Sequence, residues 1–132
     1  MTPGPALYEP LTNPATLRTM AGDDALFKEL ADIIVRSIPH YVQSLEQAVS
    51  GKDTAAIRAA LHKIKGTLQM VGADHTLQLL DAIGRDIRAT GRVPQTGRTD
   101  TLMAQLHAIR AEVTTYTVPR PETIKSRNGR QP

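Results

Sequence analysis

The stretch DTAAIRAALHKIKGTLQMVG, residues 53–72, decides the fold of this chain. Asp53 is a suitable helix N-cap, and Gly72 interrupts the pattern at the other end. Between them, apolar residues recur at steps of four and three, which is the spacing of one helix face; they are Ile57, Leu61, Ile64, Leu68 and Val71. The stretch therefore predicts an amphipathic helix that buries one stripe against other elements.

The same periodicity predicts a longer helix before this stretch and two helices after it. The first begins at Asp23 or Asp24 and ends at Gly51, the second runs from Asp74 to Gly91, and the third follows the loop GRVPQTGRTD. Their apolar residues, in chain order, are Leu26, Leu30, Ile33, Ile34, Ile38, Val42, Leu45 and Val49, then Leu77, Leu80, Ile83 and Ile87, then Leu102, Leu106, Ile109, Val113 and Tyr116.

A short helix is predicted ahead of these four. Asn13 is its N-cap, Pro14 occupies its first position, and Gly22 lies near its end. Pro39 lies inside the long helix, where it lacks an N–H, so we expect a bend there rather than a break. Because short connections make successive helices antiparallel neighbours, we predict an all-α fold: an antiparallel up-and-down four-helix bundle with an additional short N-terminal helix.

The chain has 132 residues, which suits a single domain. We expect an N-terminal linker at residues 1–11, the bundle at 12–117 and a basic, disordered tail at 118–132. The positive charge belongs to the tail: residues 1–117 contain twelve Lys and Arg against twelve Asp and Glu, and residues 118–132 contain four against one. A neutral body with few, scattered aromatic residues argues against nucleic-acid binding.

Composition also indicates the compartment. The chain has no cysteine, which fits a reducing environment. It has no run of about 18 apolar residues, and its first residues, MTPGPALYEP, lack the basic and apolar segments of a signal peptide. We therefore expect a cytoplasmic protein without membrane contact, and nothing in the neutral body requires more than a monomer.

His62 is the centre of a polar face on the helix at residues 53–72. It lies one step from the apolar stripe, so it points to the solvent side together with Arg58, Lys65, Gly66 and Gln69. A glycine within a helix costs about 1 kcal/mol relative to alanine, but it leaves space beside the imidazole. Imidazole is a nitrogen nucleophile near neutral pH, and an ammonium one turn away suits a transferred phosphoryl group. An ordinary solvated helix face is the alternative interpretation of this spacing.

The motif H-x-I-K-G at residues 62–66 gives these residues a wider context. It is followed by Gly72 and preceded by the acidic-capped helix start GDDALFKEL at residues 22–30. Together these features resemble the histidine-containing phosphotransfer (HPt) domains of multistep two-component phosphorelays. The resemblance covers roughly residues 12–117.

The resemblance implies a role for each residue of the motif. His62 would accept a phosphoryl group from an aspartyl phosphate on a receiver domain and pass it to another receiver. Lys65 would neutralise the charge of the phosphate, and Gly66 would give the receiver access. The chain would be a phosphocarrier with no cofactor of its own and no autonomous kinase activity, because the Mg²⁺ of such transfers belongs to the receiver.

The sequence departs from the family pattern at one position. Several family members place a glutamine on the next helix that hydrogen-bonds the active imidazole, and here this position falls on Gly84. Gln69 or Gln78 are the available substitutes, so the group that orients His62 is left open.

The receiver is expected to dock around His62, on the exposed faces of the second and third predicted helices, which are the long helix that ends at Gly51 and the helix at residues 53–72. The candidate contacts are Arg58, Ala59, Lys65, Gln69 and Met70. Ala59 and Met70 either contact the receiver or complete the core stripe, and the spacing allows both.

Three other functions are alternatives for a helical protein with a histidine on an exposed helix face. A histidine kinase dimerisation domain is disfavoured because Lys63, not an acidic residue, follows the histidine, and the chain has no glycine-rich nucleotide-binding region. A metal site is disfavoured because no pair of histidines has the i, i+3 or i, i+4 spacing and no Glu-x-x-His motif occurs; the histidines are His40, His62, His75 and His107. A non-phosphorylated helical-bundle adaptor that binds a signalling partner stays open. The donor receiver and the acceptor receiver are not identified by the sequence.

Overall fold

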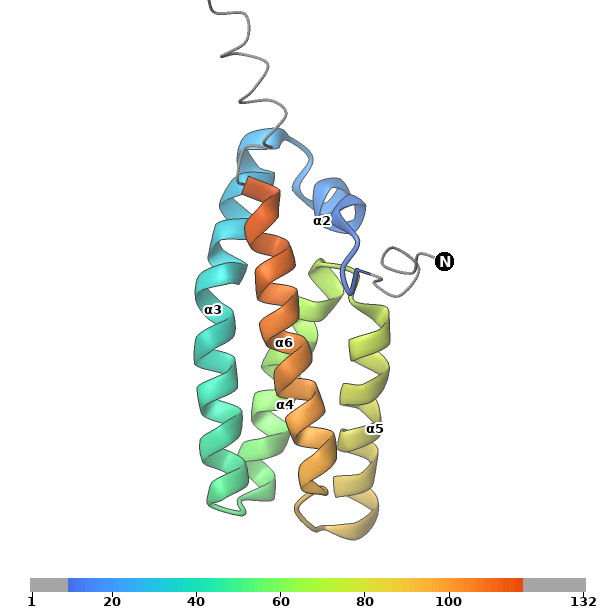
Figure 1. Ribbon diagram of the computed structural model, residues 1–132. Helices are drawn as coiled ribbons and strands as arrows, with labels where there is room; N and C mark the ends of the chain where they lie inside the picture. The colour runs from blue at the N-terminus through green and yellow to red at the C-terminus, as the bar shows by residue number, and fades with distance from the viewer. Residues whose placement is uncertain (1–9, 118–132) are drawn as a thin grey trace, which may run out of the picture.

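The computed structural model describes residues 10–117, and these residues form helices without strands. The helices are α2 (Pro14–Ala21), α3 (Asp24–Ser50), α4 (Thr54–Met70), α5 (Asp74–Thr90) and α6 (Thr96–Thr117). Helices α3 to α6 form the bundle, and α2 packs at one end of it (Figure 1). The predicted all-α four-helix bundle with a short N-terminal helix is confirmed. The predicted tail and most of the predicted linker lie outside the described residues.

Local capping fixes three of the helix starts. Asn13, Asp23 and Asp53 are the N-caps of α2, α3 and α4, and each side chain accepts a hydrogen bond from a backbone N–H two or three residues later. Helix α5 begins at Asp74, where the sequence predicts its start. Ala73 is the N-cap of α5 and makes no side-chain hydrogen bond, while Asp74 is the first helical residue. There its carboxylate still interacts favourably with the helix dipole.

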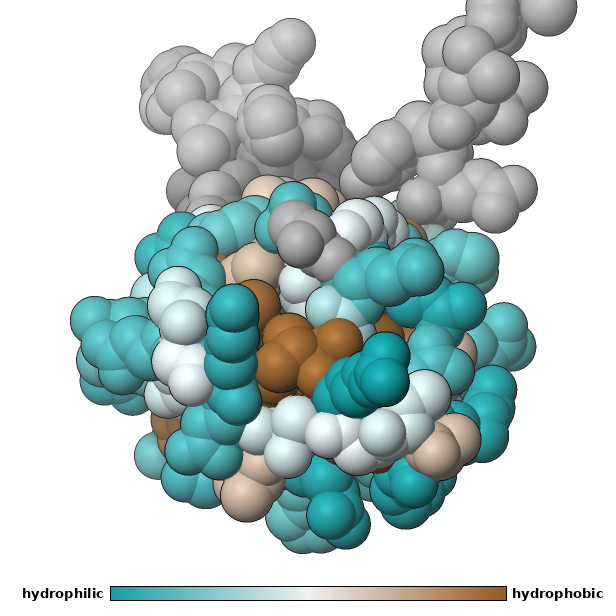
Figure 2. All heavy atoms as spheres, turned by 90° about the horizontal axis from the view of Figure 1, so that it is seen from below, coloured by the Kyte–Doolittle hydropathy of each residue, from teal (hydrophilic) through white to brown (hydrophobic). Residues whose placement is uncertain are grey.

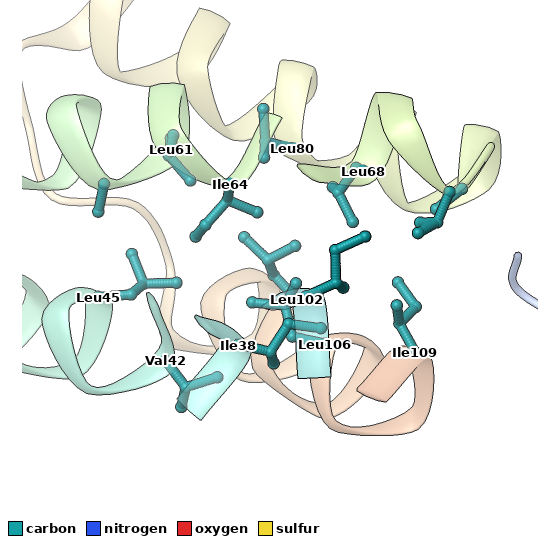
Figure 3. Packing of buried hydrophobic residues seen from close by; sticks show 14 of the residues in the cluster. Ile38, Val42, Leu45, Leu61, Ile64, Leu68, Leu80, Leu102, Leu106 and Ile109 are labelled. Atoms are coloured by element: carbon teal, nitrogen blue, oxygen red, sulfur yellow. The ribbon is translucent and has the colours of Figure 1, made fainter. Parts of the chain in front are cut away.

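The core is a continuous apolar layer along the bundle axis. Side chains of α4 face those of α3 and α6 across this layer (Figure 3). The labelled members are Ile38, Val42, Leu45, Leu61, Ile64, Leu68, Leu80, Leu102, Leu106 and Ile109, all buried. Seen along the axis from the end with the α3–α4 turn, apolar residues show at the centre of a polar ring (Figure 2). The predicted stripe of α4 is therefore its buried face.

The predicted stripe of α3 needs a correction near the N-terminus of that helix. Leu26 and Ile33 are 39% and 44% exposed, whereas Phe27, Ala31 and Ile34 are buried. Two parallel stripes, offset by one residue, satisfy the same three- and four-residue spacing here. The bundle buries the stripe that begins at Phe27, because its ring stacks on Tyr116 of α6 with the centroids 5.6 Å apart.

Helix α2 is held against the end of α4. The backbone N–H of Asn13 donates to the carbonyl of Val71 at 2.8 Å. Gly72 has φ +65°, and a Cβ built there would lie 2.6 Å from Oγ1 of Thr16. A side chain at this position would therefore be strained and would also push α2 away. The glycine that ends α4 is what allows α2 to pack closely.

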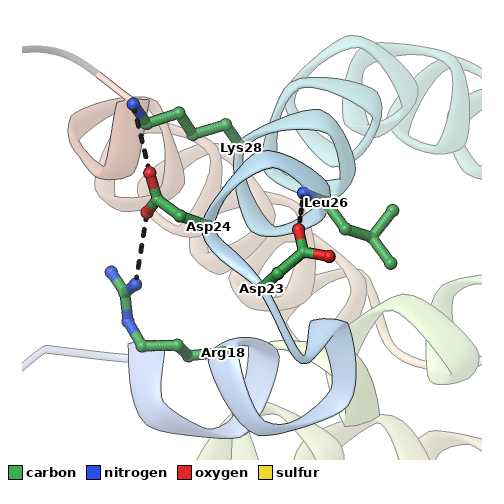
Figure 4. A network of polar contacts seen from close by, with 5 residues as sticks. All are labelled: Arg18, Asp23, Asp24, Leu26 and Lys28. Atoms are coloured by element: carbon green, nitrogen blue, oxygen red, sulfur yellow. Dashed lines mark hydrogen bonds and ion pairs between the residues drawn. The ribbon is translucent and has the colours of Figure 1, made fainter.

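Charged groups join α2 to the start of α3 (Figure 4). The carboxylate of Asp24 lies 3.5 Å from the guanidinium of Arg18 and 3.5 Å from Nζ of Lys28. The Arg18 guanidinium also lies over the Phe27 ring, 4.0 Å from its centroid. These contacts link α2 to the first turn of α3.

The segment before α2 is tied to α6. The Glu112 carboxylate accepts hydrogen bonds from the backbone N–H groups of Leu11 and Thr12 and from the Thr12 hydroxyl. That hydroxyl also pairs with the Tyr116 hydroxyl at 2.7 Å. Burial raises the pKa of Tyr116, and the charge of Glu112 adds to this effect while the Thr12 hydrogen bond opposes it.

Candidate functional site

His62 lies in the middle of α4 and faces outward. Its neighbours Leu61 and Ile64 are buried in the core, with 4% and 0% of their surface exposed. These two anchors fix the rotation of α4 about its axis, so the imidazole is held on the exposed side of the helix. The solvent-facing orientation that the sequence predicts for His62 is what the structure has.

A groove of about 280 Å³ lies beside the imidazole, between α4 and α5. Three of the residues predicted to share a face line it together: Arg58, His62 and Lys65. The remaining lining residues are Leu61, Leu80, Asp81, Gly84 and Arg88. The site is therefore built by two antiparallel helices and not by α4 alone.

The charges around the groove favour an anion. Arg58 and Lys65 from α4 and Arg88 from α5 supply three cationic side chains, and Asp81 is the one acid among the lining residues. Nζ of Lys65 lies 3.5 Å from Oδ1 of Asp81, and both side chains are a little under half exposed. Guanidinium and ammonium groups bind phosphoryl oxygens through charge-assisted hydrogen bonds.

The two helical glycines near His62 differ in their surroundings. Gly66 is exposed, and a Cβ built on it would meet nothing within 4 Å. Gly84 is buried, and a Cβ built on it would lie 3.6 Å from Nη1 of Arg88. The Arg88 guanidinium thus lies where a side chain at position 84 would project. Gly66 leaves open space beside the site, whereas a Cβ at position 84 would be in van der Waals contact with the Arg88 guanidinium.

The other residues predicted for the site do not gather in the groove beside His62. Gln69 and the alternative Gln78 are exposed but do not line the groove with His62. Ala59 is exposed and lines a second groove of about 430 Å³ between α3 and α4. Met70 is half-buried and packs against the core. The imidazole therefore lies between two grooves, one on each side of α4.

Sequence reasoning missed Asp81 and Arg88. Both lie on the face of α5 that carries Gly84, three residues before it and four residues after it. The family spacing that pointed to position 84 contained the signal, since helix residues three and four apart are surface neighbours. Extending that face by one turn in each direction would have found the acid and the third cation.

The remaining histidines lie elsewhere. His40, His75 and His107 are exposed and do not line the groove beside His62. Within residues 10–117 no three His, Cys, Asp or Glu side chains are grouped so that they could hold a metal ion. Over the same residues, no helix has the length and apolar character needed to cross a membrane.

Comparisons with known proteins identify the family to which this chain belongs. Residues 29–114, from α3 into α6, match the Hpt domain family. The fold is similar to a crystal structure of the HPT domain from the Hpt sensor hybrid histidine kinase of Shewanella, with a TM-score of 0.69. That similarity covers 80% of this chain and 92% of the other at 20% sequence identity. No match was found among curated proteins. The chain belongs to the Hpt domain family, and its function is histidine phosphotransfer in two-component phosphorelays.

Proposed function

We propose that His62 is the phosphoacceptor of this domain. It receives a phosphoryl group from the aspartyl phosphate of one receiver domain and passes it to the aspartate of another. The observation that carries this proposal is the exposed imidazole at the edge of a groove lined by three cations. None of the other histidines within residues 10–117 lines that groove.

The transfer is an in-line exchange between an oxygen and a nitrogen. The unprotonated ring nitrogen of His62 forms the N–P bond while the P–O bond to the receiver breaks, and the receiver aspartate leaves as a carboxylate. The other ring nitrogen keeps its proton. Such a transition state needs alignment and charge neutralisation more than proton transfer. Leu61 and Ile64 supply the alignment, and Lys65 neutralises charge on the phosphoryl oxygens.

Receiver access depends on the exposed surface around the imidazole. Gly66 leaves an open space one turn from His62, which admits the loops around the receiver aspartate. Arg58 lines the groove between α4 and α5, and Ala59 lines the groove between α3 and α4. A receiver that covers His62 therefore contacts both residues. Gln69 and Met70 extend the same contact toward the end of α4.

The partner supplies what this chain lacks in the proposed reaction. Mg²⁺ and the acidic residues that bind it belong to the receiver, and this chain acts without a cofactor. We propose that the domain works in the cytoplasm, because its cysteine-free sequence suits a reducing compartment. We also propose a monomer, since the electrically neutral body gives no reason to require a dimer.

The proposal is tested by labelling the protein from a phosphorylated receiver. Wild-type protein is expected to acquire label that is stable in alkali and lost in acid, as a phosphorus–nitrogen bond requires. His62→Gln should acquire none. His75→Gln is the matched control, because His75 is an exposed helical histidine outside the groove, and it should label like the wild type.

Two results would count against the proposal. Label that persists in His62→Gln would place the phosphoryl group on another residue. An unlabelled wild-type protein that still binds the receiver would indicate the non-phosphorylated adaptor instead.

A further inference from the structure

Lys65 already has an anionic partner in the unphosphorylated protein. Its Nζ lies 3.5 Å from Oδ1 of Asp81, which reaches across from α5. The resemblance to phosphotransfer domains assigned Lys65 to the phosphate and assigned no role to Asp81. An ammonium that serves a new phosphoryl group on His62 must therefore leave Asp81 or be shared with it.

Asp81 stands apart from the other charged groups at this site. The groove is lined by Arg58 and Lys65 from α4 and by Arg88 and Asp81 from α5. Three of these side chains attract the phosphoryl oxygens, and Asp81 repels them. A carboxylate beside the site opposes phosphorylation in two ways, since it holds Lys65 and adds a like charge.

We propose that Asp81 competes with the phosphoryl group for Lys65 and so weakens the phosphorylated state of His62. The inference rests on the proposed function of His62. When the phosphoryl group leaves, the N–P bond breaks, a P–O bond forms on the receiver aspartate, and Lys65 returns to Asp81. The unphosphorylated state regains an ion pair, and this favours onward transfer over retention. Asp81 is a positioning residue, because it acts through Lys65.

The exposure of the pair sets the size of the effect. The Lys65 and Asp81 side chains are 43% and 45% exposed, so water and salt screen their interaction. Exposed pairs of this kind change equilibria by roughly two- to fivefold. A carrier benefits from a small bias, because it must both accept and release the same group.

The experiment measures the equilibrium constant for phosphoryl transfer from a phosphorylated receiver to this protein. Asp81→Asn keeps the shape of the side chain and removes its charge, and it should raise the constant about two- to fivefold. The increase should shrink as salt concentration rises. Asp86→Asn is the matched control on the same helix, because Asp86 pairs with Arg98 outside the groove; it should leave the constant unchanged.

A second variant separates competition from simple repulsion. In a Lys65→Met background, Asp81→Asn should change the constant much less, because no ammonium is left to compete for. An undiminished effect in that background would contradict competition. Unfolding curves of each variant confirm that the bundle is intact.

The outcomes distinguish this inference from the proposed function. A labelled wild-type protein whose constant is unchanged or lowered by Asp81→Asn would overturn the role of Asp81 alone. A wild-type protein that takes no label would overturn the proposed function and this inference together.

Discussion

At Gly66, the effect on the stability of the free protein can be measured separately from the effect on phosphotransfer with a receiver. A Cβ at this position would meet nothing within 4 Å, so alanine fits the unbound structure without a clash. We expect Gly66→Ala to raise the free energy of unfolding by up to about 1 kcal/mol. The same methyl group would stand one turn from His62, in the space through which we propose that the receiver approaches. We therefore expect phosphotransfer to slow by on the order of tenfold.

The matched control for this variant is Gly97→Ala. Gly97 is also helical and exposed, and a Cβ there would meet nothing within 4 Å, but it lies in the first turn of α6. Gly97→Ala should raise stability without changing the transfer rate, measured by quenched-flow labelling. A Gly66→Ala protein that transfers as fast as the wild type would show that position 66 need not be empty.

The residues of the site were predictable where they share one helix. His62, Lys65 and Gly66 follow from the period of α4, because a single stripe of buried residues fixes what the rest of that helix faces. Asp81 and Arg88 were not predicted, because their approach to His62 depends on the rotation and axial position of α5 relative to α4. The one signal for them was the family spacing that places position 84 beside the imidazole, because Asp81 and Arg88 lie one turn from that position on the same face of α5.

At the scale of elements, α3 continues through Pro39, and α6 supplies a donor for the backbone carbonyl that the proline leaves without its helical hydrogen bond. Pro39 has no N–H, so the carbonyl of Val35, four residues earlier, lacks its usual helical donor. Nε of Arg110 on α6 donates to this carbonyl at 3.0 Å. The proline therefore couples two helices that are distant in the sequence, and the predicted absence of a break is confirmed.

This coupling predicts a specific double-mutant result. Arg110→Met should lower the free energy of unfolding by about 1 kcal/mol, the usual contribution of one hydrogen bond. In a Pro39→Ala background the new N–H bonds Val35 within the helix, so Arg110→Met should cost much less. Arg36→Met is the control, since Arg36 is exposed and pairs only within its own helix turn. Equal losses in both backgrounds, measured by urea unfolding, would refute the coupling.

The helices differ in how well their starts and their buried faces could be predicted from the sequence. The starts of α2, α3 and α4 were predictable because their caps are local, each bonding a residue two or three positions away. The inward face of the first turns of α3 was not, because two adjacent apolar stripes compete there. The stacking of Phe27 on Tyr116 decides between them, and that contact spans most of the chain.

At the scale of the whole molecule, the proposed function requires the bundle to present one histidine site to two successive partners. A packed core along α3 to α6 keeps α4 and α5 in register, so the cations and Asp81 stay beside the imidazole. The same surface must serve a donor and an acceptor. A carrier built this way should hold the phosphoryl group without hydrolysing nucleotide and release it only to a receiver.

The most direct test follows one phosphoryl group through both steps. The protein is labelled from a first receiver, purified, and mixed with a second, unphosphorylated receiver and Mg²⁺ in the absence of ATP. The label should leave His62 and appear on the second receiver in equal amount. Label that stays on the protein, or that is released as inorganic phosphate without ever appearing on the second receiver, would contradict a phosphocarrier role.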